Sequence, residues 1–318
     1  MTLVSIVVPV FHNAASLPAL VEALQALAAR NAGERFEYVF VDDGSRDESF
    51  AVLQQLAAGE ERMRVVKLSR NFGSNAAIVA GLSVAKGDVV GAIAADLQDP
   101  PEKFDEMLAL WRGGKKVVVA ARDERDDPAM TTFFADAFYA LFRRFALANM
   151  PARGFDFFLI DRRVVDLITG IQENNVYLMG LILWFGFDPT VVTYARRARR
   201  NEYGRSRWTV RKKIRYFIDA FVAFSHLPVR AASILGIALS VLGLGYAVLI
   251  VALWFSSDIE VAGWSSLMVV LLIVSGVQLV MLGILGEYLV RTLDETRKRP
   301  RFVIDRVLDR SDDDAGRS

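Results

Sequence analysis

The stretch from Gly87 to Glu102, GDVVGAIAADLQDPPE, decides the fold, because an apolar run in it leads directly into acids and an amide. The run from Asp88 to Ala95 contains valine and isoleucine and is too short to cross a membrane. These properties are typical of a central β-strand covered on both faces. Ligands bind beyond the carboxyl ends of strands in open α/β sheets, so Asp96, Gln98 and Asp99 follow the strand where a ligand is expected.

The oxygen-bearing side chains of this loop suit a hard divalent cation that carries a phosphorylated ligand. Pro100 and Pro101 stiffen the exit from the loop, and Pro101 or Glu102 is expected to open a helix. The same residues also fit a plain polar turn followed by a capped helix. This stretch alone leaves both interpretations open.

Apolar runs and helical stripes alternate along the first part of the chain. Strands are expected at 3–10, 36–41, 64–68, 88–95, 116–121 and 153–160, and helices at 16–30, from 47, up to 85 and at 102–111. Ser16 is expected to be the N-cap of the first helix. This alternation predicts a parallel sheet covered on both faces. No G-x-G-x-x-G or Walker lysine motif occurs where a strand meets a helix, which disfavours a dinucleotide fold or a P-loop.

Polar residues recur directly after the expected strands. They are His12 and Asn13, Asp42 and Asp43, Arg70 and Asn71, the loop 96–99, and Arg122. The carboxyl ends of parallel strands share one edge of a sheet, so this recurrence favours a binding site over ordinary turn chemistry.

Two long apolar stretches lie in the C-terminal third of the chain. Residues 231–255 contain no charge, and residues 267–286 contain Gln278 as their only strongly polar member. At about 1.5 Å per residue, each can cross a hydrocarbon core of roughly 30 Å as a helix. The alternative is a pair of buried helices in a globular core. We expect a transmembrane hairpin at 231–290, with spans at about 231–255 and 267–288.

Basic residues flank this hairpin on both sides, whereas the loop 256–264 contains Asp258 and Glu260 but no lysine or arginine. The positive-inside rule therefore places both flanks in the cytoplasm. The sequence predicts an integral protein of the cytoplasmic membrane with both termini cytoplasmic. Its parts would be a domain at 1–204, an amphipathic juxtamembrane segment at 205–230, the hairpin, and a C-terminal tail at 291–318.

Composition excludes several classes of function. The chain has no cysteine, which excludes disulfides, thiolate metal ligands and a cysteine nucleophile. The apolar N-terminus lacks a charged n-region and a small-residue cleavage site, so it indicates a strand and not a signal peptide.

The basic run before the first span favours anionic membrane lipid or a lipid phosphate over nucleic acid. Within it, residues 208–226 alternate basic and apolar side chains as an interfacial helix does.

Four segments resemble glycosyltransferase family 2 in their order and spacing. They are SIVVPVFHNAASL from Ser5, VDDGSRDES from Val41, RNFGSNAAIVAGLSVAKGD from Arg70 and ADLQDPPE from Ala95. The pattern is most similar to the polyprenyl-phosphate glycosyltransferases, the group of dolichol-phosphate mannose synthase and bactoprenol glucosyltransferase. GFDFFLIDRRVVD, GRSRWT in place of the usual G-x-S-K-Y, and LGEYLVRTLDETRKRPRF extend the resemblance to about residues 3–302.

The resemblance implies a GT-A fold at 1–204, which is an α/β, Rossmann-like nucleotide-diphospho-sugar transferase domain. It implies transfer of one sugar, with inversion, from a nucleotide-sugar donor to undecaprenyl or dolichyl phosphate on the cytoplasmic face, with Mg²⁺ or Mn²⁺ as cofactor. Carried over by position, the donor-binding residues would be Pro9, Phe11, Asn13, Asp42, Asp43, Arg70 and Asp96. The metal ligands would be Asp96 and Gln98, and the catalytic residues Asp96, Gln98 and Arg122. The lipid phosphate would be bound by Arg122, Arg199, Arg200, Ser206 and Arg207.

The chemistry of such a reaction agrees with these residue types. A phosphate monoester has a second pKa near 6 and is largely a dianion at neutral pH, so the acceptor needs no strong general base. The difficulty is to bring two anionic partners together, which a metal ion and an arginine cluster achieve by electrostatics and positioning. Neither His12 nor His226 is therefore expected to be catalytic.

The sequence also departs from the family pattern. The usual Asp-x-Asp is replaced by Ala94-Ala95-Asp96, which would weaken a metal site or move its work to Gln98, Asp99 and the donor phosphates. This departure motivates a rival hypothesis, a catalytically silent relative that binds nucleotide or lipid carrier as a scaffold. A processive polysaccharide synthase is disfavoured, because two spans build no pore and no Q-x-x-R-W motif is present. Small residues in the spans suggest a homo-oligomer; they are Gly236, Gly243, Gly276, Gly283 and Gly286.

Overall fold

The computed structural model describes residues 1–123, 140, 143–144, 147, 149–151, 154–155, 157–171, 173, 177–195, 227–256 and 263–309. The chain forms two compact units, Met1–Ala220 with Arg299–Ser318, and Phe221–Lys298. Four predicted lipid-phosphate ligands lie outside the described residues, as does the predicted interfacial helix at 208–226; the four are Arg199, Arg200, Ser206 and Arg207.

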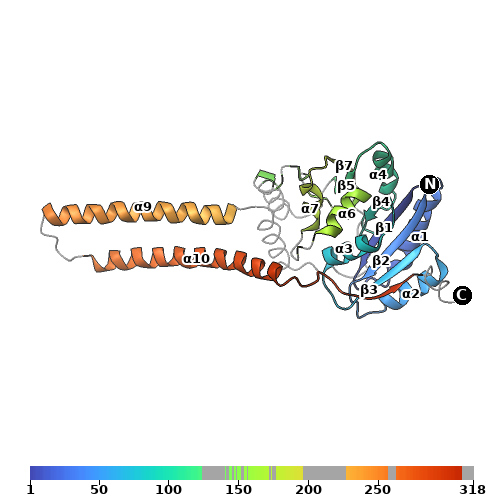
Figure 1. The fold of residues 1–318 in the computed structure, drawn as a ribbon, viewed down its shortest axis with the longest axis horizontal. Helices are drawn as coiled ribbons and strands as arrows, with labels where there is room; N and C mark the ends of the chain where they lie inside the picture. The colour runs from blue at the N-terminus through green and yellow to red at the C-terminus, as the bar shows by residue number, and fades with distance from the viewer. Residues whose placement is uncertain are drawn as a thin grey trace. The chain divides into compact units, whose positions relative to one another are not determined.

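In the first unit, the described strands form one eight-stranded sheet in the order β7-β5-β6-β4-β1-β2-β3-β8 (Figure 1). The strands are β1 (Leu3–Val10), β2 (Arg35–Asp42), β3 (Met63–Leu68), β4 (Val89–Ala92), β5 (Val117–Arg122), β6 (Phe157–Asp161), β7 (Pro189–Tyr194) and β8 (Ile304–Leu308). The described helices of this unit include α1 (Leu17–Arg30), α2 (Ser49–Gly59), α3 (Ser74–Val84), α4 (Lys103–Arg112), α6 (Arg162–Gly170) and α7 (Leu178–Trp184).

Helices cover both faces of this sheet, as the alternation of elements predicted. Alternate side chains of β1 point to opposite faces, and Ile6 belongs to a core cluster with Leu24 of α1 and Phe104 of α4. On the other face, α3 approaches Val7 so closely that a Cβ at Gly81 would lie 2.3 Å from a Val7 methyl group. The α/β, GT-A class of fold expected from the sequence is confirmed.

The prediction of a wholly parallel sheet is wrong at β6 and β8. β1 pairs in parallel with β2 and β4, but β6 runs antiparallel to both β4 and β5, and β8 runs antiparallel to β3. The residues of β6 from Phe157 to Ile160 are all buried. A strand that is apolar on both faces has the same sequence pattern whether it is parallel or antiparallel to its neighbours, so the pattern cannot indicate its orientation.

The C-terminal strand β8 returns to the sheet after the second apolar helix, and it occupies the edge next to β3 (Figure 1). From the sequence, residues 291–318 were expected to form a C-terminal tail. The middle three residues of β8 are exposed, and they are Asp305, Arg306 and Val307. Such a half-polar edge strand lacks the apolar alternation by which strands are recognised.

The stretch from Gly87 to Glu102 forms a shorter strand than expected, because β4 ends at Ala92 and not at Ala95. The backbone N–H of Ile93 still donates to the carbonyl of Val7 at 3.0 Å, after which the chain leaves the sheet. Ile93 and Ala95 remain buried in the core, which explains why the apolar pattern outlasts the strand. Glycine is required at Gly91, because a Cβ there would lie 2.5 Å from the ring of Phe104.

The second unit contains two long helices, α9 (Leu227–Ser256) and α10 (Trp264–Thr296), which run side by side (Figure 1). Within them, Val229–Tyr246 and Val269–Thr296 are long and apolar enough to span a membrane. Large apolar side chains on both helices are exposed, for example Leu242 and Leu279 at 70% each. The two predicted span-length helices are therefore present, and α10 continues past the expected end of its span.

Candidate donor and metal site

The loops that follow β1 and β2 are joined at the carboxyl edge of the sheet. The backbone N–H of Asp43 donates to the carbonyl of Val10 at 2.8 Å, and the N–H of His12 donates to Ser45 Oγ at 3.0 Å. The same edge carries the loops after β3 and β4, because β1 to β4 are mutually parallel. The structure therefore brings together the polar residues that the sequence placed after separate strands.

Side-chain oxygens accept hydrogen bonds from the backbone of the β1–α1 loop. Asn13 Oδ1 accepts from the N–H of Phe11 at 3.1 Å, and the N–H of Asn13 donates to Ser49 Oγ at 2.8 Å. His12 has a φ of 58°, an uncommon value for a residue with a side chain, and its ring contacts the Phe11 ring with centroids 4.3 Å apart. Together with Pro9 at the end of β1, Phe11 and Asn13 lie at the predicted edge.

Asp42 ends β2 and is completely buried. Its Oδ1 accepts from the N–H of Ser45 at 3.3 Å, and among the described residues its buried Oδ2 has no hydrogen-bond partner. Burial raises the pKa of Asp42, and the hydrogen bonds from Ser45 partly oppose this. A buried acceptor without a donor is costly, so Asp42 is suited to receive an N–H or O–H donor of a ligand.

Asp43 differs from its neighbour, because both of its oxygens already accept hydrogen bonds. Oδ1 accepts from the N–H of Phe72 at 2.7 Å and Oδ2 from the N–H of Gly73 at 2.9 Å. Burial raises the pKa of Asp43, and these two backbone bonds lower it. Asp43 therefore fixes the loop before α3, which contains Arg70. The guanidinium of Arg70 lies 4.1 Å from the centre of the Phe72 ring.

A glycine between these loops allows their close approach. Gly44 has a φ of 67°, and a Cβ there would lie 2.5 Å from the carbonyl carbon of Arg70. Any side chain at this position would push the β2–α2 loop away from the β3–α3 loop. The close contact between the two loops thus requires a glycine in the VDDGS segment.

The loop after β4 carries the predicted metal ligands. Asp96 is 9% exposed, and its Oδ1 accepts from the N–H of Gln98 at 3.3 Å. Leu97 between them has a φ of 57°, so this short loop is tightly turned. Gln98 is partly buried and Asp99 is buried. The structure therefore keeps Asp96 and Gln98 together at the carboxyl edge.

The role predicted for Ser16 is corrected by its contacts. Ser16 lies at the N-cap position of α1, but its side chain makes no capping bond. Its hydroxyl donates instead to the carbonyl of Ala95 at 2.7 Å and to that of Asn13 at 3.0 Å. Ser16 thus ties the β1–α1 loop to the loop of Asp96.

The residues present fit a divalent cation that binds together with a phosphorylated ligand. Among the described residues, no group of three or more His, Asp or Glu side chains is arranged to hold a metal ion. Asp96 and Gln98 offer one carboxylate and one amide oxygen, and Ala94 offers none. Mg²⁺ commonly uses one or two carboxylates and completes its shell with substrate phosphates and water. The site therefore fits that mode and not a preformed cage.

Arg122 ends β5 and is partly buried. Because β6 is antiparallel to both β4 and β5, these two strands run in the same direction. Arg122 therefore lies at the same edge as Asp96, with β6 between their strands. Its partner in the register of β7 is Tyr194, whose hydroxyl donates to Asp99 Oδ1 at 2.5 Å.

Sequence reasoning missed two of the residues that organise this edge. Ser45 and Tyr194 each hold a loop that carries a predicted site residue. A buried tyrosine needs a partner for its hydroxyl, and Tyr194 ends the strand PTVVTY, so the sequence contained a signal for this contact.

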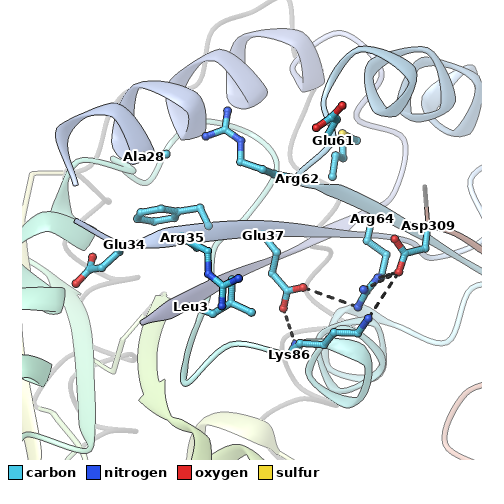
Figure 2. A pocket seen from close by; sticks show the side chains of 12 residues that line it. Leu3, Ala28, Glu34, Arg35, Glu37, Glu61, Arg62, Arg64, Lys86 and Asp309 are labelled. Atoms are coloured by element: carbon cyan, nitrogen blue, oxygen red, sulfur yellow. Dashed lines mark hydrogen bonds and ion pairs between the residues drawn. The ribbon is translucent and has the colours of Figure 1, made fainter. Parts of the chain in front are cut away.

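The opposite, amino edge of the sheet contains a cavity of about 520 Å³ that is lined by acids and bases (Figure 2). Arg64 is only 8% exposed, and its Nη2 lies 2.6 Å from Asp309 Oδ2. Glu37 pairs with Arg64 at 3.8 Å and accepts from the N–H of Lys86 at 2.5 Å. These groups bind one another, and Asp309 directly follows β8, so this edge anchors the C-terminal strand.

The mixed sheet, with acids and an arginine at its carboxyl edge, has the GT-A architecture that the sequence predicted. Residues 5–168 match the model of glycosyl transferase family 2, and the chain belongs to this family. It is a glycosyltransferase.

Several curated relatives extend the similarity over nearly the whole chain. An uncharacterized glycosyltransferase of Bacillus subtilis is 36% identical over 94% of this chain and 92% of its own length. The undecaprenyl-phosphate 4-deoxy-4-formamido-L-arabinose transferase of Pseudomonas savastanoi is 35% identical over 96% and 90%. The prophage bactoprenol glucosyl transferase homolog of Escherichia coli is 30% identical over 96% and 99%. These names confirm the resemblance to the polyprenyl-phosphate group.

Among solved structures, the chain is similar to the mannosyl-3-phosphoglycerate synthase of Rubrobacter xylanophilus. The TM-score is 0.49 at 22% identity, and the alignment covers 70% of this chain and 72% of that chain.

Proposed function

We propose that this protein transfers a single sugar, with inversion, from a nucleotide-diphosphate sugar to a polyisoprenyl phosphate at the cytoplasmic face of the membrane. One observation carries the proposal: a chain with a GT-A donor edge also contains two apolar helices of span length. Relatives whose names specify bactoprenol or undecaprenyl phosphate, and which match 95–96% of this chain, support the acceptor.

The donor nucleotide would lie at the ends of β1, β2 and β3. Asp42 would accept a hydrogen bond from the base or ribose through its unpaired Oδ2. Pro9, Phe11 and Asn13 would form the adjoining wall, with Arg70 next to the diphosphate. Asp43 would act indirectly, because its oxygens are bound to the loop of Phe72 and Gly73.

The donor diphosphate would be bound near Asp96 and Gln98. A Mg²⁺ or Mn²⁺ ion held by these two side chains would stabilise the charge that develops on the leaving nucleoside diphosphate. Asp96 is buried to nine-tenths, so its oxygen is held in place before the donor arrives. Such preorganisation avoids a reorganisation penalty during the reaction.

The acceptor phosphate would attack the anomeric carbon from the face opposite the diphosphate. A phosphate oxygen forms the new bond to carbon, the bond to the diphosphate oxygen breaks, and one displacement inverts the configuration. Arg122 at the carboxyl edge would attract the phosphate dianion, together with the predicted Arg199, Arg200, Ser206 and Arg207. The dianion needs no deprotonation, so positioning and charge supply the catalysis.

The basic residues on both flanks of the hairpin support a cytoplasmic location of the catalytic domain. The glycines of α9 and α10 support self-association, because a Cβ at Gly243, Gly276 or Gly283 would meet no described atom within 4 Å. Open glycine faces let a second membrane helix approach closely. We therefore propose a homo-oligomer in contact with membrane lipid.

The most informative experiment supplies membranes that contain this protein with undecaprenyl or dolichyl phosphate and a panel of labelled nucleotide sugars. The proposal predicts transfer of label to the lipid from at least one donor, stimulated by Mg²⁺ or Mn²⁺. Membranes that contain the Asp96→Asn variant should show little transfer. No transfer from any donor by correctly folded protein would contradict the proposal.

A scaffold that binds nucleotide or lipid carrier without turnover is the second candidate. The alanine at position 94, and the absence of a three-residue acid or His cluster among the described residues, favour it. It predicts saturable nucleotide binding with no labelled lipid product. Metal-stimulated turnover that Asp96→Asn abolishes would exclude it.

A further inference from the structure

We propose that Tyr194 is a positioning residue of the donor site, which holds the loop of Asp96 and Gln98 through its hydrogen bond to Asp99. The inference rests on the proposed function, because it assigns that loop to the donor diphosphate and its metal ion. It adds a residue that lies nearly a hundred positions further along the chain, on the edge strand β7.

The bond between Tyr194 and Asp99 is short and sheltered from water. The hydroxyl donates to Oδ1 at 2.5 Å, and the two residues are only 2% and 3% exposed. Hydrogen bonds to a carboxylate are stronger than those between neutral groups, and burial strengthens them further. Asp99 is therefore bound firmly to β7.

The ring of Tyr194 is itself held in place. Its centroid lies 5.2 Å from that of Phe157 on β6, and Phe157 lies 5.5 Å from Phe104 of α4, both in edge-to-face geometry. All three rings belong to the same buried core cluster. A side chain fixed in this way can position a loop, because its own rotation is blocked.

The loop that Tyr194 holds has little support from the sheet. β4 ends at Ala92, so residues 93–99 continue beyond the last ladder pair. Ser16 fixes the beginning of this segment through the carbonyl of Ala95 at 2.7 Å, and Tyr194 fixes its end at Asp99. Asp96 and Gln98 lie between these two anchors. Leu97, also between them, has a φ of 57°, a conformation that persists where the surroundings impose it.

Because position 94 is an alanine, the anchoring of this loop matters for the position of a bound cation. With one carboxylate left in the motif, the placement of a cation depends on Asp96 and on the turn that carries it. Tyr194 is also the register partner of Arg122, so one strand pair links the diphosphate loop to the arginine proposed for the acceptor. Removing the hydroxyl would loosen the loop without removing any proposed ligand.

The test compares Tyr194→Phe with Tyr38→Phe in the full-length protein. Tyr38 is a matched control, because it is completely buried and its hydroxyl donates to the carbonyl of Leu24 at 2.9 Å, between β2 and α1. Mn²⁺ binding is measured by electron paramagnetic resonance in the presence of whichever of UDP, GDP and dTDP the wild type binds, and transfer kinetics are measured alongside.

Tyr194→Phe should weaken Mn²⁺ binding in the presence of the nucleotide roughly three- to tenfold and lower kcat, which is the scale of one net hydrogen bond. Tyr38→Phe should leave both quantities unchanged, although both variants lower the melting temperature. Asp99→Asn retains an acceptor for Tyr194 and should be milder than Asp99→Ala. The double variant Tyr194→Phe with Asp99→Ala should bind Mn²⁺ no more weakly than Asp99→Ala alone, because both remove one bond.

Equal Mn²⁺ binding in Tyr194→Phe and Tyr38→Phe would overturn the inference while leaving the proposed function intact. Failure of the wild type to transfer sugar from any donor would overturn the proposed function instead, and Mn²⁺ binding would still report on the loop. Additive effects in the double variant would show that Tyr194 and Asp99 act separately, which would also contradict the inference.

Discussion

The two edges of the catalytic sheet use buried charge in opposite ways. At the amino edge, the acids and bases around Arg64 bind one another and hold the C-terminal strand. At the carboxyl edge, Asp42 is completely buried and keeps an oxygen that no described residue satisfies. Charges that pair within the protein stabilise the amino edge. At the carboxyl edge, an acceptor without a donor is suited to bind a ligand.

The largest expected effect is that of Asp96→Asn at the carboxyl edge. The change removes the charge while keeping the shape, so sugar transfer should fall by about a hundredfold or more, as when a preorganised electrostatic contact is lost. The melting temperature should stay close to that of the wild type. Initial rates at saturating Mn²⁺ and donor check this, with the surface variant Asp105→Asn as control. Wild-type rates for Asp96→Asn would place the metal elsewhere.

Arg64→Ala should produce the largest loss of stability at the amino edge. It leaves Asp309 and Glu37 without their buried cation, and breaking such a pair costs about 3 kcal/mol. The free energy of unfolding from denaturant titration checks this. Arg30→Ala is the control, because the side chains of Arg30 and Asp105 are 41% and 35% exposed and their pair should contribute less than about 1 kcal/mol.

Activity separates the two edges in this experiment. The transfer rate per folded molecule should be unchanged in Arg64→Ala, since the residue lies at the opposite edge from Asp96. If Arg64→Ala kept the stability of the wild type but lost sugar transfer, the two edges would not have the separate roles assigned to them.

Asp42→Asn should change the pH dependence of stability. Burial raises the pKa of Asp42, so between the ordinary value and the raised one the folded protein binds more protons than the unfolded chain. The stability contributed by this group therefore falls as pH rises through that window. The melting temperature of the wild type minus that of Asp42→Asn should therefore fall as pH rises from 3 to 7. A difference in melting temperature that does not change with pH would show that the carboxylate is not desolvated.

The same substitution should weaken nucleotide binding about tenfold, because a carboxylate oxygen is replaced at a position that would face the base or ribose. Isothermal titration with the nucleoside diphosphate that the wild type binds measures this. Unchanged affinity would move the nucleotide away from Asp42.

The smallest expected effect is that of Glu60→Gln, next to the cavity of the amino edge. Hydrogen bonds from Arg62 lower the pKa of Glu60 to about 2. The resulting stability is present above a pH of about 4.5 and is lost as pH falls through 2. Because Arg62 is 40% exposed, the loss in Glu60→Gln at neutral pH should be below about 1 kcal/mol. Melting curves of the wild type and Glu60→Gln at pH 7 and pH 2 test this prediction. An equal difference in melting temperature at both pH values would show that the stability does not come from the charge of Glu60.

Much of the first unit could be predicted because its core strands and helices follow simple periodicities. The bounds of β1 agree with the prediction residue for residue, since an apolar run there is bounded by polar loops. The end of β4 was predicted wrongly, because Ile93 and Ala95 stay buried after the chain has left the sheet. Burial and strand pairing are different properties, and the sequence pattern reports only the first.

The sequence indicated which polar residues gather at the carboxyl edge, but it did not indicate what each of them contacts. Asp42 and Asp43 are adjacent acids, and nothing in the sequence indicates that one keeps an open oxygen while the other binds two backbone N–H groups. The contribution of Tyr194 depends on a contact across nearly a hundred residues. Such long-range contacts follow from the strand order β7-β5-β6-β4, which local patterns do not encode.

The most direct test of the central claim is the mass spectrum of the lipid formed when purified protein acts on undecaprenyl phosphate with its nucleotide sugar and Mn²⁺. The account predicts a product heavier than the acceptor by one sugar residue, formed by the wild type and nearly absent with Asp96→Asn. A lipid that carries several sugars, or unchanged lipid with every donor despite correct folding, would contradict it.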